Sequence, residues 1–594
     1  MVTGLALLAT SLVLPGSAIG QSNGKTTAQS IGHGEPGHIC GTDMASPEAR
    51  QALDNYRQAR DSGQLAARHR PSAFKSQAPP DVGDRKMFRV SESGWIEVEF
   101  ELMDKEDGLY HLWVSIYELD SGRITDDVIQ GLRTALVEAT PGGIINEDAG
   151  VMANNEVVLG PPPDFDGDGV TDVLMYDIDA NDDTPGSFVA GYVHSTDINP
   201  NATPGTGNQA DVLYLDSNQG ISAGATASTA AHEYAHLIHF ATGFDIDTFI
   251  SEGIAEYLTV VNGLGRSRYA FLALPGETDL PLMNWRSGSA DVVRDYAKAE
   301  LFFRYLGEQM GPSIVSKIAG NPYKGAAGID SVLTANGSSL AAMLLDYHSA
   351  NLVNDRRIDF RFGYGTDVQS SGVRANVNTT FSGGTSTPPF ADGSKPSLES
   401  GAVNYVDFRN VADLRLRFDA AAAPVLLESA RERVAARVFL QDELGEYSYR
   451  DLAPQEDAHF IAGNFFKARV VFIHTQPGST VVGRFDYAGE WLSFGQATPV
   501  DESPELPTAV TLDQNYPNPF NPATTIGWEL PEAGDVNVRV FDQLGRVVAE
   551  VASGFFPAGA HSASFDGSRL ASGTYLYVLD AGGQRITRHL TLLK

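Results

Sequence analysis

The hydrophobic positions of this 594-residue chain change their spacing several times, and each change marks a new predicted element. Apolar and polar residues alternate over 96–100 and 111–117, which predicts two strands, whereas residues 126–137 have the spacing of an amphipathic helix. A helical stretch that ends at Phe240 follows later. Before it, short apolar runs predict three further strands, at residues 155–159, 173–176 and 211–216.

The second half of the chain passes from helical to strand-like spacing. A short helical pattern at 249–258 precedes a longer helical region from Asp295 to Asn354. Residues 361–495 have alternating apolar positions separated by Gly, Ser and Pro, which predicts a β-sandwich. An acidic, proline-containing linker at 496–508 then leads to a region of short alternating strands at 509–594.

Residues 1–95 show fewer regular hydrophobic patterns than the rest of the chain. The apolar run that ends at Leu14 is too short to span a bilayer, and small residues follow it. Residues 1–20 are therefore expected to be a secretory signal peptide, cleaved before Gln21. Residues 21–95 are polar apart from a helical patch at 47–64, and we expect a leader or a pro-segment there.

Composition and charge narrow the classes of partner. Asp and Glu number 75 against 42 Lys and Arg, which gives a net charge of −33. So acidic a chain is repelled by nucleic acid and by anionic membranes, and neither is an expected partner. No stretch after the N-terminus is long and apolar enough for a transmembrane helix. The single cysteine, Cys40, excludes an intramolecular disulfide.

The strongest chemical signal is the sequence H-E-x-x-H within the helical stretch that ends at Phe240. Residues four apart share one face of a helix, so His232 and His236 can bind a single zinc ion through their imidazoles. Glu233 lies next to them, where it can act as general base on a water. A third ligand has to come from elsewhere in the chain. Glu252, in the next helical pattern, suits that role, and Glu256, one turn later, can accept the free N–H of His232.

These two segments resemble the gluzincin zinc peptidases, and most of all the hyicolysin type, in which an N-E-G-[LI]-x-E-Y block follows H-E-Y-x-H. Here Ser251 stands where that block has Asn. The resemblance implies an α+β, thermolysin-like catalytic domain over 96–360, with zinc held by His232, His236 and Glu252. As the remaining ligand we rank Glu256 second and His239 a distant third. His239 lies on the same helix as His232 and His236, and three ligands from one helix would not surround the metal.

Tyr296 opens a further motif. Residues 296–301, Y-A-K-A-E-L, resemble the helix start of gluzincin aminopeptidases, whose Tyr donates to the reaction intermediate. The resemblance implies that Tyr296 supports the oxyanion, although Ala299 replaces a Gly of that motif. The alternative is an ordinary core tyrosine. The element that holds a substrate amine in those aminopeptidases is missing here, which favours an endopeptidase over an exopeptidase.

An aspartate-rich loop precedes the strand predicted at 173–176. Its carboxylates at alternate positions, with Gly between them, are typical of a loop that binds a hard cation such as calcium; they are Asp164, Asp166, Asp168 and Asp172. Met175 occupies the twelfth position, where an EF-hand has Glu, so this is not an EF-hand. The alternative is a tight Asp/Gly turn.

The last 85 or so residues resemble the type A C-terminal sorting domain of the type IX (Por) secretion system. The resemblance rests on motifs along the whole segment: N-Y-P-N-P-F-N-P at 515–522, F-D-Q-L-G-R at 541–546, and A-S-G-T-Y at 571–575. It implies Sec export followed by passage across an outer membrane to the surface or beyond, with the type IX machinery as partner. A seven-strand sandwich is expected. The fold class is therefore multidomain, a gluzincin α+β domain followed by two β-sandwiches.

The predicted function is that of a secreted zinc endopeptidase acting on proteins or peptides. The alternative from another class is a surface adhesin whose peptidase-like lobe only binds. Two interpretations of Cys40 are open. It is either a small buried or exposed leader residue, which we favour, or a thiolate ligand that holds the enzyme latent by taking the position of the water.

Overall fold

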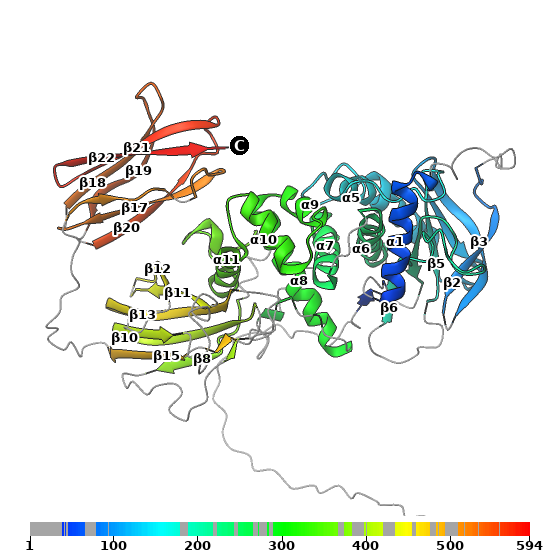
Figure 1. Cartoon of the computed structure of the whole chain (residues 1–594), viewed down its shortest axis with the longest axis horizontal. Coiled ribbons are helices and arrows are strands. Elements are labelled where there is room, and N and C mark those ends of the chain that lie inside the picture. Colours follow the sequence, from blue (N-terminus) through cyan, green and yellow to red (C-terminus); the bar gives the residue numbers. More distant parts are fainter. Residues whose placement is uncertain are drawn as a thin grey trace, which may run out of the picture.

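The computed structural model covers the chain, and three regions can be distinguished in it (Figure 1). The first combines a sheet with helices, the second is a large sheet packed against those helices, and the third consists of two sheets at the C-terminus. The described residues are 38–40, 42, 46–65, 79–92, 94–178, 188–217, 223–242, 247–264, 271–272, 282–283, 285, 289–365, 374–382, 397–398, 401–419, 434–442, 444–453, 459–475, 483–484, 486–493, 509–515, 517–532, 534–556 and 559–593. The expected signal peptide, 1–20, and linker, 496–508, lie outside them.

The first region is built on a seven-stranded sheet with the order β1-β6-β7-β5-β4-β3-β2. Strands β4, β5 and β7 are parallel to one another, β2–β3–β4 form antiparallel pairs, β6 is antiparallel to β7, and β1 runs parallel to β6. The strands are β1 (His38–Cys40), β2 (Arg85–Ser91), β3 (Trp95–Glu106), β4 (Tyr110–Ser115), β5 (Thr171–Tyr176), β6 (Phe188–Tyr192) and β7 (Val212–Asp216).

Alternation along the strands separates the two faces of this sheet. In β7, Leu213 and Leu215 face a core shared with helices, whereas Val212 and Tyr214 belong to a second core made by the opposite face. The first face is covered by α1 (Pro47–Asp61), α4 (Asp126–Arg133), α5 (Val151–Leu159) and α6 (Ala223–Thr242). The central position of α6 in that core places the H-E-x-x-H motif beneath the sheet.

The strands predicted at 96–100, 111–117, 173–176 and 211–216 are confirmed within β3, β4, β5 and β7, except that β4 ends at Ser115 and α3 (Ile116–Ser121) begins there. The helix predicted at 126–137 is α4 continued by a π-helical turn, Thr134–Glu138, and the helical patch at 47–64 is α1. The expected leader therefore does not stand apart, since β1, α1 and β2 all come from residues 21–95 and pack with the first sheet.

The strand predicted at 155–159 is wrong, because these residues form the second half of α5. The side-chain amide of Asn155 donates to the carbonyl of Ala231 in α6 at 3.0 Å, and that of Asn154 donates to Asn262 Oδ1 at 3.0 Å. Neighbouring side chains of a strand point to opposite faces, whereas those of a helix can reach the same side. The helix therefore lets both buried amides find partners, which the short apolar run did not indicate.

Helices α7 to α11 continue the core from the first region toward the second. They are α7 (Thr248–Val261), α8 (Ser289–Met310), α9 (Ser313–Ala319), α10 (Gly325–Ala335) and α11 (Leu340–Val353). Close packing between α7 and α8 requires a glycine, since a Cβ atom on Gly253 would lie 2.4 Å from Cδ2 of Phe303. Gly253, in the S-E-G-I sequence, therefore allows α7, the helix that carries Glu252, to pack closely against α8.

The second region is a six-stranded sheet with the order β12-β11-β13-β10-β15, in which β8 also pairs with β10. Its strands are β8 (Thr379–Ser382), β10 (Val403–Asp419), β11 (Val434–Gln441), β12 (Tyr447–Leu452), β13 (His459–His474) and β15 (Asp486–Ser493). One face packs on α11, and the described residues add only a two-stranded pair, β9 (Ser397–Leu398) with β14 (Gly483–Arg484). A second large sheet, which a sandwich requires, is not among the described residues of 361–495.

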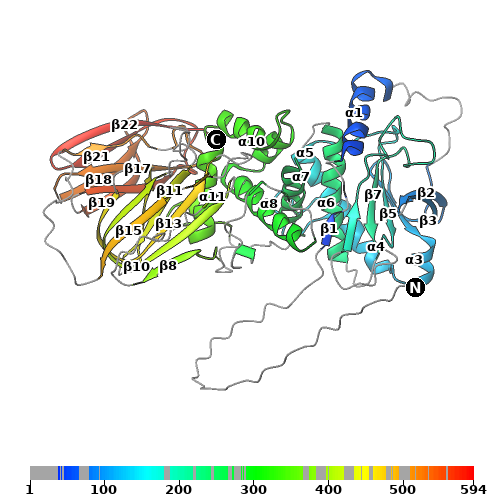
Figure 2. The ribbon, with the colours of Figure 1, turned by 60° about the horizontal axis from the view of Figure 1, so that its bottom comes forward.

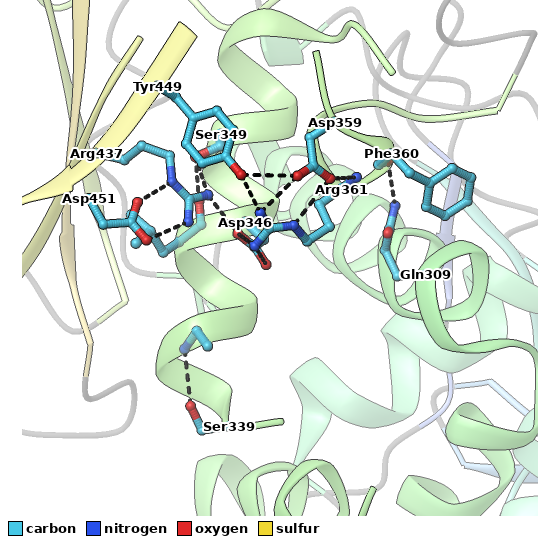
Figure 3. A network of polar contacts seen from close by, with 12 residues as sticks. Gln309, Ser339, Asp346, Ser349, Asp359, Phe360, Arg361, Arg437, Tyr449 and Asp451 are labelled. Carbon is cyan, nitrogen blue, oxygen red and sulfur yellow. Dashed lines mark hydrogen bonds and ion pairs between the residues drawn. The ribbon is translucent and has the colours of Figure 1, made fainter. Parts of the chain in front are cut away.

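A buried cluster of charged residues joins this sheet to the helices (Figure 3). Arg437 of β11 is 2% exposed and donates to Asp346 of α11 at 2.6 Å and also to Asp451 of β12. Arg361, in the single turn Phe360–Phe362, donates to Asp359 at 2.8 Å. Because the buried guanidinium of Arg437 joins β11 to Asp346 of α11, the contact between sheet and helices is specific as well as apolar.

The C-terminal region contains seven strands in a three-stranded and a four-stranded sheet around one core. The strands are β16 (Thr511–Leu512), β17 (Ala523–Leu530), β18 (Gly534–Phe541), β19 (Val547–Phe556), β20 (Gly559–Asp566), β21 (Gly573–Ala581) and β22 (Gln584–Leu592). Trp528 of one sheet and Tyr577 of the other are fully buried in that core. Among the described residues, no helix combines the length and apolar character needed to cross a bilayer.

Candidate metal centre

Helix α6 carries the H-E-x-x-H motif through the protein interior. Its small residues allow close packing, since Ala230, Ala231 and Ala235 are all fully buried. His236 is likewise fully buried, and His232 is 6% exposed. The two imidazoles therefore meet in a site that the surrounding helices close to water on most sides.

Three side chains converge on one point in this site. His232 Nε2 lies 3.1 Å from His236 Nε2 and 3.1 Å from Glu252 Oε2, and His236 Nε2 lies 3.4 Å from the same carboxylate oxygen. In a tetrahedral zinc site with bonds of ~2.0–2.1 Å, neighbouring ligand atoms lie about 3.3–3.4 Å apart. The triangle of two nitrogens and one oxygen therefore has the size that such an ion requires.

The outer atoms of this triangle are held by further side chains. Glu256 Oε1 lies 3.5 Å from His232 Nδ1, as expected for the residue that orients this imidazole. Ser251, which replaces the Asn of the resembling block, lies 3.0 Å from His236 Nδ1 and 3.4 Å from His239 Nδ1. His239 thus faces Ser251 and is not part of the converging group.

Glu233 of α6 is 1% exposed, and its side chain lies against Gly191 of strand β6. A Cβ atom on Gly191 of β6 would lie 3.1 Å from its Cγ and 2.8 Å from the carbonyl oxygen of Tyr214, so only glycine lets this strand approach the carboxylate. Glu233 Oε2 accepts a hydrogen bond from Thr42 Oγ1 at 2.7 Å and one from the thiol of Cys40 at 3.6 Å. Thr42 lies in no sequence motif, so the prediction from sequence did not include it.

Tyr296, which comes from α8, also lies at this site. Its ring is 6.2 Å from that of His232 and meets Trp285 edge-on at 5.0 Å. Its hydroxyl accepts the backbone N–H of Cys40 at 3.2 Å. The thiol of Cys40, with His232, His236 and Glu252, completes a group of four ligand atoms that all lie within 4.8 Å of one another.

The electrostatics of the group favour a cation. Burial alone lowers the pKa of His232, but the carboxylates of Glu252, Glu233 and Glu256 raise it to about 9. Burial raises the pKa of Glu252, but the imidazoles of His236 and His232 lower it to about 2. Both shifts mean that the site stabilises positive charge at its centre. Burial and the carboxylates Glu233 and Glu252 raise the pKa of the Cys40 thiol.

The aspartate loop at 164–172 gathers a different set of residues from the predicted one. Asp164 and Asp166 come together with Asp211, which precedes β7 and is 2% exposed, and their ligand atoms lie within 4.8 Å of one another. Oδ2 of Asp211 accepts the backbone N–H of Phe165 at 2.8 Å, whereas its Oδ1 is buried and has no hydrogen-bond partner among the described residues.

The other two predicted ligands of the loop have different partners. Asp172 accepts from Trp113 Nε1 at 2.8 Å and from Lys86 Nζ at 3.3 Å, and it does not join the group of Asp164, Asp166 and Asp211. Asp168 Oδ1 accepts the backbone N–H of Val170 at 2.9 Å, and it lies outside the group that could hold an ion. Asp211 belongs to the next strand and could not be assigned from the loop motif alone.

Comparison with known proteins gives two matches, each to a part of the chain. Residues 514–592 match the family described as Secretion system C-terminal sorting domain, which indicates type IX secretion to the cell surface or beyond and confirms the predicted localisation. The chain is also 28% identical over 184 residues to Neutral metalloprotease ShpI of Staphylococcus hyicus, an alignment that covers 28% of this chain and 41% of that protein. The chain thus matches about two fifths of the length of this relative.

Solved structures add no argument about the fold. The full extracellular region of zebrafish Gpr126/Adgrg6 is 10% identical, with a TM-score of 0.12, over 35% of this chain and 30% of that one. The apo structure of Bacteroides uniformis beta-glucuronidase 3 is 12% identical, with a TM-score of 0.10, over 34% and 26%. Similarities this low do not identify a shared fold.

Proposed function

We propose that the first region is a zinc-dependent endopeptidase of the gluzincin type, secreted by means of the C-terminal sorting domain. The observation that carries the proposal is the triangle of His232 Nε2, His236 Nε2 and Glu252 Oε2, with edges of 3.1, 3.1 and 3.4 Å. The similarity to a neutral metalloprotease supports it independently. Two neutral imidazoles and one carboxylate are the donor set of catalytic zinc sites that keep one position open.

The roles of the chain's own residues follow from their positions around this triangle. When bound, zinc supplies Lewis-acid chemistry to a water and to the peptide carbonyl. Glu233 would take a proton from the water and pass it to the leaving amine, because its Oε2 lies 3.6 Å from Cys40 Sγ, the fourth atom of the ligand group. The hydroxyl of Tyr296 donates to the developing oxyanion. Glu256 orients the imidazole of His232.

The proposal is tested with the purified protein in two forms, the full-length chain and a form without residues 21–45, the part of the expected leader that precedes α1. Zinc is measured by mass spectrometry of the metal, and proteolysis by degradation of casein. About one zinc per chain together with casein degradation is the expected result. Stoichiometric zinc without any cleavage would instead identify a surface binding protein. Cleavage of peptides with a free N-terminus but not of N-blocked ones would identify an aminopeptidase.

We infer that the second group, Asp164, Asp166 and Asp211, binds calcium. Three carboxylates within 4.8 Å of one another repel unless a cation neutralises them, and oxygen-only donors suit calcium. The buried Oδ1 of Asp211, without a hydrogen-bond partner among the described residues, provides an otherwise unsatisfied ligand. Isothermal titration with calcium in the presence of saturating zinc tests this, with zinc alone as the control. The absence of binding heat would leave an Asp/Gly turn.

We further propose that residues 509–594 fold as a seven-strand sandwich that the type IX machinery recognises. Support comes from the two sheets that share one core and from the match over 514–592. Fusion of residues 509–594 to a reporter with its own signal peptide should send the reporter out of a host that has this secretion system. Retention of the fusion in the periplasm would contradict the proposal.

A further inference from the structure

Residues 38–42 lie across the candidate metal centre and contact each part of it. Strand β1 adds to the sheet beside β6, at the side where α6 and α8 lie (Figure 2). The register pairs Cys40 with Gly191, the glycine that allows β6 to approach Glu233. Without β1, strand β6 would be the edge of the sheet, and an exposed edge beside a catalytic centre can bind an extended peptide by strand addition.

Residues 38–42 contact the side chains that the proposed reaction requires, those of Glu233 and Tyr296. Thr42 Oγ1 donates to Glu233 Oε2 at 2.7 Å, so this oxygen is not available to accept from a water. The Cys40 thiol lies 3.6 Å from the same oxygen and donates to it only while the sulfur is protonated. The backbone N–H of Cys40 donates to the hydroxyl of Tyr296 at 3.2 Å. Cys40 Sγ is the fourth member of the ligand group. A base, an oxyanion donor and the open metal position are thus covered together.

The segment is held in place from both sides. Thr42 Oγ1 also accepts the backbone N–H of Val193, just after β6, at 2.9 Å. Helix α1 begins only a few residues later, at Pro47, and its side chains Leu53 and Tyr56 are buried in the core shared with α6. A segment tethered this closely acts at a high effective concentration, so even weak contacts keep it bound.

We propose that residues 38–42 hold the peptidase latent, with Cys40 as the fourth zinc ligand, until the segment is displaced or cleaved. This inference rests on the proposed function and concerns the regulation of the same site. Zinc binding to the thiol forms a Zn–S bond and releases the thiol proton to solvent. Activation reverses this step, because a water replaces the sulfur and the thiolate takes up a proton, and no oxidant is required.

The direct test is X-ray absorption at the zinc edge on the full-length protein. We expect a sulfur scatterer at ~2.3 Å, which is lost in Cys40→Ser while the zinc content stays unchanged. Replacing zinc by cobalt should give a thiolate-to-cobalt charge-transfer band in the wild type only. A first shell of nitrogen and oxygen alone in the wild type would overturn the proposal, and this result does not depend on the folding of any variant.

The functional test compares proteolysis by full-length proteins. A closed form that predominates by about ten to one predicts a rise in activity of roughly tenfold or more in Cys40→Ser/Thr42→Ala, with a smaller rise in Cys40→Ser. Ser46→Ala is the matched control, because Ser46 caps α1 through Ala49 N, and it should remain latent. An organomercurial that binds the single thiol should activate the wild type but not Cys40→Ser.

The outcomes separate the inference from the proposed function. Full-length wild type that is as active as the double variant would overturn latency and leave the peptidase proposal intact. If residues 21–45 are removed and the protein binds zinc and keeps its melting temperature but cleaves nothing, the proposed function fails instead. Zinc–sulfur coordination in the full-length protein would in that case still identify Cys40 as a ligand.

Discussion

The first region contains two groups of candidate ligands, and they differ in donors, support and charge. One group combines two imidazole nitrogens and one carboxylate, from the packed helices α6 and α7, with the thiol of Cys40 from strand β1. The aspartate group offers only carboxylates, two of them from a loop, with Asp164 exposed to solvent and Asp166 partly buried. Nitrogen and sulfur donors suit zinc, whereas carboxylate oxygens suit calcium. The comparison teaches that two groups of ligands in one region can favour different metals through the type of donor atom.

The largest expected effect concerns Glu233, which separates catalysis from metal binding within the first group. Glu233→Gln keeps the shape of the side chain but cannot take up a proton, so proteolysis should fall by roughly 10²–10⁴-fold. Its zinc content should stay at the wild-type level. Casein degradation by the form without residues 21–45 measures the first quantity. Retention of more than a few per cent of activity would show that another group is the base.

We expect Tyr296→Phe to cause the second-largest loss of proteolytic activity. It removes the hydroxyl and leaves the contact with Trp285, so kcat should drop by roughly 10²–10³-fold while KM changes little. Steady-state kinetics on one peptide substrate can separate the two constants. An equal loss in Trp285→Phe with the hydroxyl of Tyr296 present would indicate that packing, and not the hydroxyl, matters.

Zinc affinity should rank the residues around the triangle. Glu252→Ala removes a ligand and should weaken binding most, whereas Glu256→Ala removes the partner of His232 and should cost about 10–100-fold. His239→Ala should have the smallest effect, since His239 contacts Ser251 outside the group. Competition with a chromophoric chelator measures all three. A greater loss in Glu256→Ala than in Glu252→Ala would exchange the two roles.

The aspartate group should show a smaller effect, on stability. Calcium at about 100 times its Kd should stabilise the wild type by about 2.7 kcal/mol, and Asp211→Asn should abolish this response. Asp172→Asn is the matched control: it should keep the calcium response, because Asp172 is bonded to Trp113 and Lys86. Calorimetry with zinc bound measures both. Loss of the response in Asp172→Asn but not in Asp211→Asn would restore the ligand set expected from the loop motif.

The pH dependence of this group sharpens the comparison further. Burial first, and then Asp168, raises the pKa of Asp166 from 3.8 to about 7. A carboxyl whose pKa is raised in the folded state stabilises below its unfolded pKa and loses that contribution as pH rises through the folded one. Without calcium, stability should therefore fall between about pH 4 and 7, and calcium should restore it mainly at the upper end. A calcium response that is equal at pH 5 and pH 8 would contradict this.

How much the sequence could predict depends on whether the information is local. His232 and His236 are four apart on one helix, and Glu252 and Glu256 are four apart on the next, so a short pattern was sufficient to propose the group. Asp211 lies near Asp164 and Asp166 because β7 pairs with β5, a contact between distant segments that no loop motif contains. Thr42 was missed for the same reason, since its position depends on β1 pairing with β6.

The shared core between helices and second sheet has a consequence for how the chain folds after export. Val403, Tyr405 and Ile473 of the sheet are buried in the same cluster as Phe302 of α8 and Leu344 of α11. Helices and sheet should therefore form a single cooperative unit, in which the helices become stable only once residues near 473 have joined them. The sorting domain has its own core and can fold independently. Packing of the second sheet against the helices is thus the long-range step of folding.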